Sequence, residues 1–309
     1  MSDWCLIESD PAVFTELIEL FGARCLAVEE VIGLEHEFLR DYANIYGLIL
    51  LFKWKGGKER SAADGIIVPD APVYFAKQSI NNACATFAIV NTLLNHSDKI
   101  ELGETLENFL SFTQDMNPSL RGTQVGECDV LREAHNSFAP VELFSIDQSA
   151  SESGDAYHFV TFVYKSGTIW ELDGLQDGPI IAADADDQNY KEKLMEVVSK
   201  RVMEKSAEDS KDGGEGICFS LMAVVDDPLP LLEKQIEEAM LQEIPTQYLE
   251  ERLAQLREKR KKGKQENQRR RHNYVPMIVE LLKALAEKGK LKGILDDALL
   301  KKENRTQKQ

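Results

Sequence analysis

Apolar and polar positions along the first three quarters of the chain follow helix-like and strand-like patterns in turn. Residues 10–22 (DPAVFTELIELFG) are amphipathic, with Asp10 as N-cap, Pro11 at the first helical position and Gly22 as the stop. This pattern predicts a capped helix. Residues 84–95 (CATFAIVNTLLN) are apolar on all sides, which predicts a central buried helix. Further helices are expected at 103–116 and 126–138.

Strand-like runs separate these helices. Residues 156–174 contain two apolar strands around the turn KSG, which predicts a β-hairpin. Single strands are expected at 47–55, 71–78 and 219–225, with loops at 55–65 and at about 205–216. The mixture predicts an α+β fold class, with a central antiparallel sheet flanked by helices.

The character of the sequence changes after DDPLP (226–230). From residue 231 onward only helical stretches rich in Glu, Lys, Leu and Arg remain, broken at Pro245 and Pro276. Their apolar positions form stripes that cannot close a core of their own. We therefore expect a mixed α and β domain at 1–226, followed by an all-helical C-terminal extension at 227–309.

Composition bounds the class of protein. The chain has 309 residues, of which 43% are hydrophobic, so it can form a real core. No apolar run approaches the length of a membrane span, and the N-terminus is acidic where a signal peptide would be basic and then apolar. The five cysteines are odd in number and widely spaced, and the histidines are not at ligand spacing with them. We expect reduced thiols, no metal and no cofactor.

The net charge of −17 is unevenly distributed. Residues 251–309 hold 18 Lys and Arg against 8 Asp and Glu, whereas residues 1–250 hold 18 against 45. This asymmetry is consistent with a basic partner or a separately docking tail, and also with charge that only maintains solubility. The basic cluster KRKKGK (259–264) has two interpretations, a nuclear localisation signal or a solvated helix face.

Cys84 stands at the start of the buried helix and has two interpretations. A free cysteine is often a small buried hydrophobe. In the first turn of a helix, which we expect Asn82 to cap, the unpaired N–H groups and the helix dipole would instead stabilise a nucleophilic thiolate. Gln78, six residues upstream, could donate to an oxyanion together with the Cys84 N–H.

A cysteine nucleophile needs a base, and His158 is the candidate because it lies inside an otherwise apolar strand. The alternative is a core histidine bonded to backbone. Hairpin geometry favours catalysis, because it brings His158 opposite or diagonal to Asp173 on the next strand. A histidine whose tautomer is fixed by a carboxylate completes a Cys–His–Asp triad. The other histidines suggest surface, capping or tail roles: His36, His96, His135 and His272.

Two segments carry a specific resemblance: QSINNACATFAIVNTLLN (78–95) and DAYHFVTFVYKSGTIWELDGLQDGP (155–179). Together they resemble the ubiquitin carboxyl-terminal hydrolase family, which has a papain-like catalytic domain. The resemblance assigns four roles by position: oxyanion donor to Gln78, nucleophile to Cys84, general acid and base to His158, and orienting residue to Asp173. Ala85 stands where short members of the family have glycine.

The ends of the chain resemble one subtype. WCLIESDPAVFTELIELFG (4–22), GLILLFKWK (47–55) and RRRHNYVPMIVELLKALAEKGKL (269–291) are similar to the long, proteasome-associated form of isozyme L5 type. The ending KKENRTQKQ (301–309) departs from the Lys/Glu-rich ending of that subtype.

The resemblance implies a cysteine-dependent deubiquitinase that hydrolyses thioester, amide and isopeptide bonds at the C-terminal glycine of ubiquitin, in the cytoplasm and nucleus. It implies that 145–156 crosses the active site and limits which leaving groups pass. The extension would dock a proteasomal ubiquitin receptor, and a chromatin-remodelling subunit would compete for a similar surface. No nucleic-acid or membrane partner is expected. Substrate contacts are expected at Leu6, Ile7, Glu8, Ser9, Asp10 and Pro11, and at Gly216, Ile217, Cys218, Phe219, Ser220 and Leu221.

Triad logic alone leaves rivals open. A papain-like peptidase or an acyltransferase would have the same Cys–His–Asp order, and only the flanking motifs argue against them. A ubiquitin-binding scaffold with weak catalysis is the alternative from another class. Filled positions at Gln78, Cys84, His158 and Asp173 argue against it.

Overall fold

The computed structural model describes residues 4–54, 65–80, 82–139, 156–211 and 219–295. Over these residues, seven strands form one antiparallel sheet in the order β1-β7-β2-β4-β5-β6-β3. The α+β class predicted from the sequence is confirmed. The strands are β1 Leu26–Glu30, β2 Ile45–Trp54, β3 Ile66–Ile67, β4 Ala156–Lys165, β5 Thr168–Asp173, β6 Ile180–Asp184 and β7 Phe219–Asp226.

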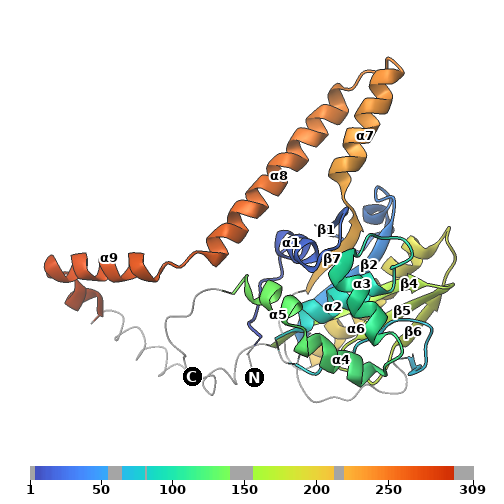
Figure 1. Ribbon diagram of the computed structural model, residues 1–309, viewed down its shortest axis with the longest axis horizontal. Helices are drawn as coiled ribbons and strands as arrows, with labels where there is room; N and C mark the ends of the chain where they lie inside the picture. Colours follow the sequence, from blue (N-terminus) through green and yellow to red (C-terminus); the bar gives the residue numbers. More distant parts are fainter. Residues whose placement is uncertain (1–3, 55–64, 81, 140–155, 212–218, 296–309) are drawn as a thin grey trace. The chain divides into compact units, whose positions relative to one another are not determined.

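Helices cover both faces of the sheet (Figure 1). One face packs against the first helices of the chain in the largest apolar cluster, and the other packs against α6. The central strands β2, β4 and β7 therefore have apolar residues on both faces, as buried strands require. The helices of the first face are α1 Pro11–Phe21, α2 Cys84–Leu94, α3 Gly103–Thr113, α4 Pro118–Glu127 and α5 Asp129–Asn136, while α6 spans Tyr190–Lys211 and a 3₁₀ turn spans His36–Leu39.

The two helices that matter most to the site form where the sequence predicts them. Asp10 caps α1 by accepting from the Ala12 N–H, and Gly22 ends it with a φ of 105°. All residues of α2 are buried, as its apolar surface on every side requires. Cys84 is its first helical residue.

Residues 71–78 do not form the predicted strand. Side-chain amides of α2 and of the residue after it take the place of a neighbouring strand. Asn95 accepts from the Tyr74 N–H and donates to the Tyr74 carbonyl, and Asn91 does the same for Ala76. An apolar, strand-like sequence is thus paired to a helix by two asparagines.

Other differences from the prediction concern the length of α6 and elements that the sequence pattern did not indicate. Residues 205–211, predicted as loop, continue α6, and 180–204 contain β6 and most of α6 although the sequence pattern assigned no element there. Helix α4 was also not predicted; Asn117 caps it by accepting from the Leu120 N–H. The helices in the described residues do not include one that is both long and apolar enough to cross a membrane.

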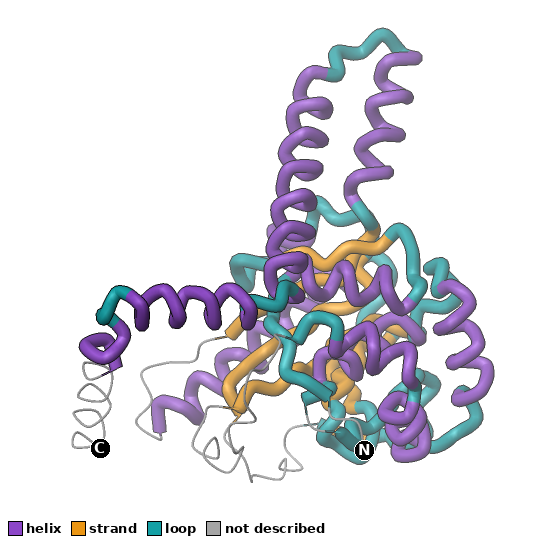
Figure 2. The backbone as a smooth tube through the Cα atoms, turned by 60° about the vertical axis from the view of Figure 1, so that its left-hand side comes forward, coloured by secondary structure: helices purple, strands orange, loops and turns teal. Residues whose placement is uncertain are grey.

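The C-terminal part is helical, as expected, with α7 Pro228–Leu241, α8 Gln247–Arg271 and α9 Val275–Glu287. Figure 2 shows α7 and α8 as an antiparallel hairpin, joined by a small apolar cluster of Leu232, Ile236 and Leu253. The chain divides into two compact units, one of Met1–Ala139 and Ser153–Asn267 and the other of Pro140–Glu152 and Gln268–Gln309. Helix α9, in the second unit, buries none of its residues.

The basic cluster at 259–264 lies on α8 and faces acidic groups of the first unit. Arg260 forms two hydrogen bonds with the Asp227 carboxylate, at 2.6 and 3.0 Å, and Lys259 pairs with Glu29. Farther along α8, the buried Asn267 donates to the Ala12 carbonyl and to Glu16. These contacts fasten α8 to α1 and to the start of α7, so this face of the cluster is not simply solvated.

His96 and His135 are buried, so their predicted surface or capping roles are wrong. His96 follows α2 and is 3% exposed, and neither ring nitrogen has a hydrogen-bond partner of normal geometry in the described chain. Burial lowers the pKa of His96 from 6.5 to about 4; the Tyr46 backbone opposes the shift, and the charges of Lys165 and Lys99 add to it. The charged form is therefore disfavoured in the folded state.

This burial predicts an acid-sensitive fold. The pKa of His96 is lower in the folded chain than in the unfolded chain, so unfolding takes up a proton below pH 6.5. The free energy of unfolding should fall as the pH drops from 6.5 to about 4, by up to about 3 kcal/mol from this residue. Chemical denaturation at a series of pH values should show a flatter curve for His96→Leu. The control Leu20→Ala, at an exposed position without a titratable group, should keep the wild-type slope, and equal slopes for all three proteins would contradict the assignment.

Candidate active site

Cys84 lies at the N-terminus of α2, in the first turn, as predicted, but Asn82 does not cap the helix. The N-cap residue is Ala83, and no side chain caps it. Asn82 instead has a φ of 66° and donates from Nδ2 to the Trp4 carbonyl at 3.2 Å. A left-handed backbone at Asn82 turns its side chain toward the N-terminal segment, so the free N–H groups of the first turn stay available near the sulfur.

Cys84 is buried, with 8% of the residue exposed. Burial raises its pKa from 9.0 to about 11, while hydrogen bonds with the backbone of Ala85, Cys84 and Phe159 act in the lowering direction. The expected stabilisation of a thiolate by the helix start is therefore present but is outweighed by loss of solvent. At neutral pH the free protein holds a thiol, which needs a base before it can attack.

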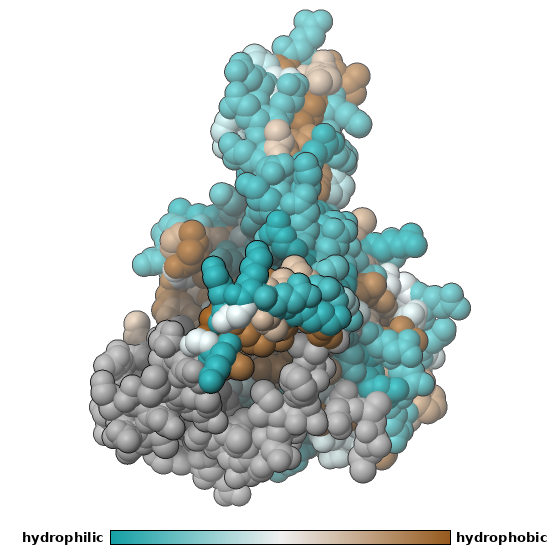
Figure 3. Space-filling view, turned by 90° about the vertical axis from the view of Figure 1, so that its left-hand side faces the viewer, coloured by the Kyte–Doolittle hydropathy of each residue, from teal (hydrophilic) through white to brown (hydrophobic). Residues whose placement is uncertain are grey.

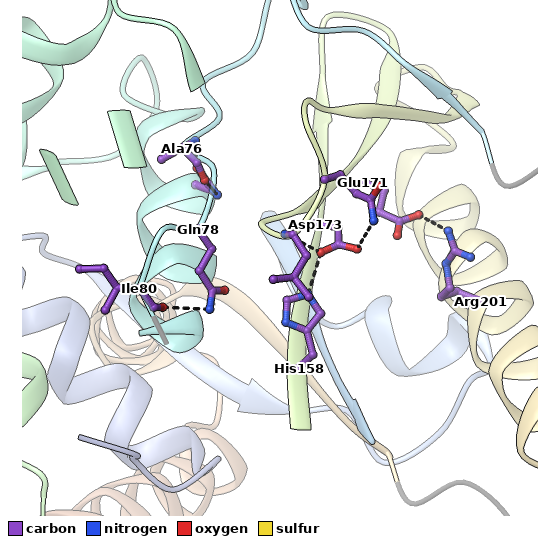
Figure 4. Close-up of polar contacts among 10 residues, drawn as sticks. Ala76, Gln78, Ile80, His158, Glu171, Asp173 and Arg201 are labelled. Atoms are coloured by element: carbon purple, nitrogen blue, oxygen red, sulfur yellow. Dashed lines mark hydrogen bonds and ion pairs between the residues drawn. The ribbon is translucent and has the colours of Figure 1, made fainter. Parts of the chain in front are cut away.

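Hairpin geometry predicts that His158 and Asp173 lie close together, and in the structure they form a hydrogen bond. The register pairs Val160 with Asp173, so His158 and Asp173 are diagonal neighbours on one face of the hairpin. The distance from His158 Nε2 to Asp173 Oδ1 is 2.7 Å (Figure 4). Because a carboxylate accepts, Nε2 carries the proton and donates, which leaves Nδ1 for the thiol.

The Asp173 carboxylate is held on both oxygens. Oδ1 also accepts from the Leu175 N–H at 3.0 Å, and Oδ2 accepts from Gln176 Nε2 at 3.3 Å. The pair itself is buried. These bonds fix the carboxylate and through it the plane of the imidazole.

The two halves of the site meet at β4. Helix α2 packs against this strand, where Thr161 Oγ1 donates to the Ala88 carbonyl at 3.4 Å. The Cys84 sulfur is hydrogen-bonded to the backbone of Phe159, the residue after His158. Among the described hydrogen bonds, His158 bonds Asp173 but not Cys84; catalytic hydrogen bonds often tighten only when substrate is bound.

Gln78 is held beside the end of the hairpin. Its N–H donates to the Gly174 carbonyl at 2.8 Å, and its Nε2 donates to the Ile80 carbonyl at 3.1 Å. Gly174 directly follows Asp173, and a Cβ built at Gly174 would lie 2.9 Å from the Gln78 Cβ. Figure 4 shows Gln78 approaching from the side of α2 and the His158–Asp173 pair on the hairpin.

A buried ion pair behind Asp173 was not identified from the sequence. Arg201 of α6 donates to Glu171 at 2.7 Å, and both side chains are buried (Figure 4). Glu171 shares a strand face with Asp173, so the pair ties the hairpin to α6 next to the site. A helical arginine in a Lys/Glu-rich segment gives no sequence signal of such a partner.

The residues predicted to contact substrate differ in accessibility. Leu6 is 72% exposed, whereas Ile7 and Leu221 are core residues. Asp10 and Pro11 begin α1, and Phe219 is partly exposed at the start of β7. Glu8, Ser9 and Ser220 belong to the same two segments. Gly216, Ile217 and Cys218, and the predicted gating loop except Ala156, lie outside the described residues.

A buried thiol at a helix start, together with a strand histidine oriented by a carboxylate, is the arrangement that papain-like cysteine hydrolases share with some acyltransferases. Comparison with known proteins narrows this class. Residues 4–203 match the family described as ubiquitin carboxyl-terminal hydrolase, family 1, and residues 247–291 match a second family described as ubiquitin carboxyl-terminal hydrolases. The chain belongs to the ubiquitin carboxyl-terminal hydrolase family, and it is a cysteine-type deubiquitinase.

Relatives match over nearly the whole length. The chain is 40% identical to ubiquitin carboxyl-terminal hydrolase ubh-4 of Caenorhabditis elegans, covering 96% of this chain and 91% of the relative. It is 34% identical to isozyme L5 of Dictyostelium discoideum, covering 96% and 95%. A crystal structure of Trichinella spiralis UCH37 bound to ubiquitin vinyl methyl ester is similar, with a TM-score of 0.66, 32% identity and coverage of 85% and 100%. These similarities confirm the resemblance to the long subtype.

The close contact between Gly174 and Gln78 allows a test of whether the position of the Gln78 amide matters for catalysis. In Gly174→Ala the new methyl group must displace Gln78, so its amide moves away from the site. We expect kcat on a fluorogenic ubiquitin substrate to fall about tenfold, with KM changed less than about twofold, because a displaced oxyanion donor weakens only the transition state. Leu175→Ala, at the exposed neighbouring side chain, is the matched control. An unchanged kcat in folded Gly174→Ala would show that this space is not needed.

Proposed function

We propose that this protein hydrolyses thioester, amide and isopeptide bonds at the C-terminal glycine of ubiquitin. One observation carries the proposal. His158 is hydrogen-bonded to Asp173, and the residue after it on β4, Phe159, is hydrogen-bonded through its backbone to the Cys84 sulfur. Family membership supplies the substrate class, and UCH37 of Trichinella spiralis has been crystallised with ubiquitin vinyl methyl ester.

The first step is acylation. His158 Nδ1 takes the Cys84 proton, and the sulfur attacks the carbonyl carbon of the terminal glycine. The oxyanion accepts from the Cys84 N–H and from Gln78 Nε2, whose second N–H remains for this use while the first donates to Ile80. The carbon–nitrogen bond then breaks, and the imidazolium gives its proton to the leaving amine.

The second step releases ubiquitin. Water attacks the thioester carbonyl while His158 takes its proton, the carbon–sulfur bond breaks, and the thiol is restored. Asp173 accepts from Nε2–H throughout and stabilises the imidazolium in both steps. Burial raises the pKa of the Cys84 thiol and favours its neutral form, so a base assists formation of the attacking thiolate.

The alternative, a ubiquitin-binding scaffold with weak catalysis, is favoured by the high pKa of the thiol and by the lack of a described Cys84–His158 hydrogen bond. It predicts binding of ubiquitin without efficient chemistry. The two functions differ in whether the sulfur reacts.

Incubation with ubiquitin bearing a C-terminal vinyl methyl ester separates the two functions. We expect a covalent adduct in the wild type and none in Cys84→Ala, because the sulfur is the attacking atom. Cys128→Ala, a partly buried cysteine in the same unit, is the control and should react like the wild type. The adduct is detected by intact-mass spectrometry. Binding of ubiquitin without an adduct would contradict the hydrolase proposal and favour the scaffold.

We also propose that the helical extension docks a partner, a proteasomal ubiquitin receptor, for which a chromatin-remodelling subunit competes. The supporting observation is α9, whose apolar residues Met277, Leu281 and Leu282 are exposed. Figure 3 shows further hydrophobic surface at the tip of the α7–α8 hairpin, where Leu241 and Tyr248 are exposed. Apolar stripes on a helix are what a helix-binding partner needs. Such a partner implies cytoplasmic and nuclear locations.

The docking role predicts separable functions. Removal of 272–309 should abolish receptor binding in a pull-down and leave the ubiquitin adduct unchanged. This cut keeps all of α8 and so preserves its bonds to Ala12 and Asp227. Leu281→Glu should weaken receptor binding, whereas the charge-changing control Lys283→Glu on the same helix should not. Full receptor binding by the truncated chain would refute a docking role for residues 272–309.

A further inference from the structure

His135 joins three segments around the start of α2. It lies on α5, is 0% exposed, and both ring nitrogens are hydrogen-bonded. Nε2 lies 2.7 Å from the Cys5 carbonyl and Nδ1 lies 2.8 Å from Thr86 Oγ1. A carbonyl only accepts, so Nε2 carries the proton, and the Thr86 hydroxyl donates to Nδ1. Burial lowers the pKa of His135, which agrees with this neutral tautomer.

The N-terminal segment is clamped at two successive residues. The Cys5 N–H donates to Asn136 Oδ1 at 3.0 Å, while the Cys5 carbonyl accepts from His135. The Trp4 ring meets the His135 ring edge-on at 4.9 Å, and the Trp4 carbonyl accepts from Asn82. Two neighbours on α5 thus bind both backbone groups of one residue, as a paired strand would. Figure 1 shows the blue start of the chain running beside α5.

The two ends of this link lie where the reaction needs them. Thr86 is buried in the first turn of α2, two residues after Cys84. Cys5 directly precedes Leu6, which is 72% exposed and begins the segment proposed to contact ubiquitin. The rigid imidazole therefore sets the spacing between the nucleophile's helix and the first substrate contact.

We propose that His135 is a positioning residue that holds the substrate-contacting segment, from Leu6 onward, in register with the helix of Cys84. The inference rests on the proposed hydrolysis of ubiquitin and adds a residue that acts through Cys5 rather than on the reacting atoms. The imidazole suits the role because its two nitrogens face opposite ways, one donating and one accepting.

Two substitutions divide the link into its halves. In His135→Asn the amide sits near the position of Nδ1, so the Thr86 bond can be kept and the Cys5 bond is lost. In His135→Gln the amide reaches the position of Nε2, so the Cys5 bond can be kept and the Thr86 bond is lost. Each variant loses one buried hydrogen bond, so a merely structural role predicts similar effects on stability and on kinetics.

The experiment measures KM and kcat on a fluorogenic ubiquitin substrate, together with hydrogen exchange of the amides of residues 4–9. We expect His135→Asn to raise KM about five- to tenfold with kcat nearly unchanged, and to speed exchange at Cys5. His135→Gln should keep KM within about twofold of the wild type. The thermal midpoints of both variants show whether each is folded.

Equal KM values for both folded variants, with the wild type active, would overturn the positioning role alone. A wild type that does not turn over ubiquitin would instead overturn the proposed function, and with it the substrate side of this inference. Rescue of KM by Gln but not by Asn is the outcome that supports it.

Discussion

The complete burial of α2 is the constraint on which the rest of the structure depends. Burying a helix on every side means that each polar group on it must find a partner inside the protein. Thr86 bonds His135, Asn91 and Asn95 bond the segment at 74–76, and the Ala88 carbonyl accepts from Thr161 of β4. Each of these bonds ends on an element that carries part of the site. The helix therefore locates the N-terminal segment, the approach to Gln78 and the histidine strand together.

The same burial sets the chemistry of the sulfur. A thiol at a helix start would normally be acidified by the free N–H groups and the dipole, and the backbone bonds of Cys84 act in that direction. Loss of water outweighs them and raises the pKa to about 11. Burial thus favours the neutral thiol at Cys84, and we expect His158 to accept its proton during the reaction.

How far the sequence predicts this site depends on the range of the contacts. Period-two alternation and a short turn are local, so the sequence predicts that His158 lies close to Asp173. The register that makes them diagonal neighbours comes from the structure, with its two-residue turn at Ser166 and Gly167. Local caps are less secure: Asn82 has the right residue type for an N-cap but bonds Trp4 instead. A contact 78 residues away in the chain outcompetes the helix end.

Polar contacts between residues far apart in the chain could not be predicted from the sequence for the same reason. Arg201 and His135 lie in helices of ordinary polar composition, and only the fold shows that one is buried against Glu171 and the other against Thr86. Residues 71–78 have a strand-like pattern because they are buried and extended, but their partners are asparagine side chains. Hydrophobic patterning reports burial, and it does not identify what satisfies the backbone.

The hydrogen bonds of α8 show that the helical extension packs directly against α1 of the catalytic domain. Arg260 binds Asp227, the residue that caps α7 by accepting from the Leu229 N–H, and Asn267 binds the first turn of α1 at Ala12. Gly263 lies against the same Ala12, where a Cβ would approach to 2.6 Å. Helix α1 continues from the segment that contains Leu6. Helix α8 therefore supports this segment at its C-terminal end, through α1, while His135 holds it at its N-terminal end, through Cys5. The segment proposed to contact ubiquitin is thus fixed at both of its ends, by α5 through Cys5 and by α1, which α8 supports.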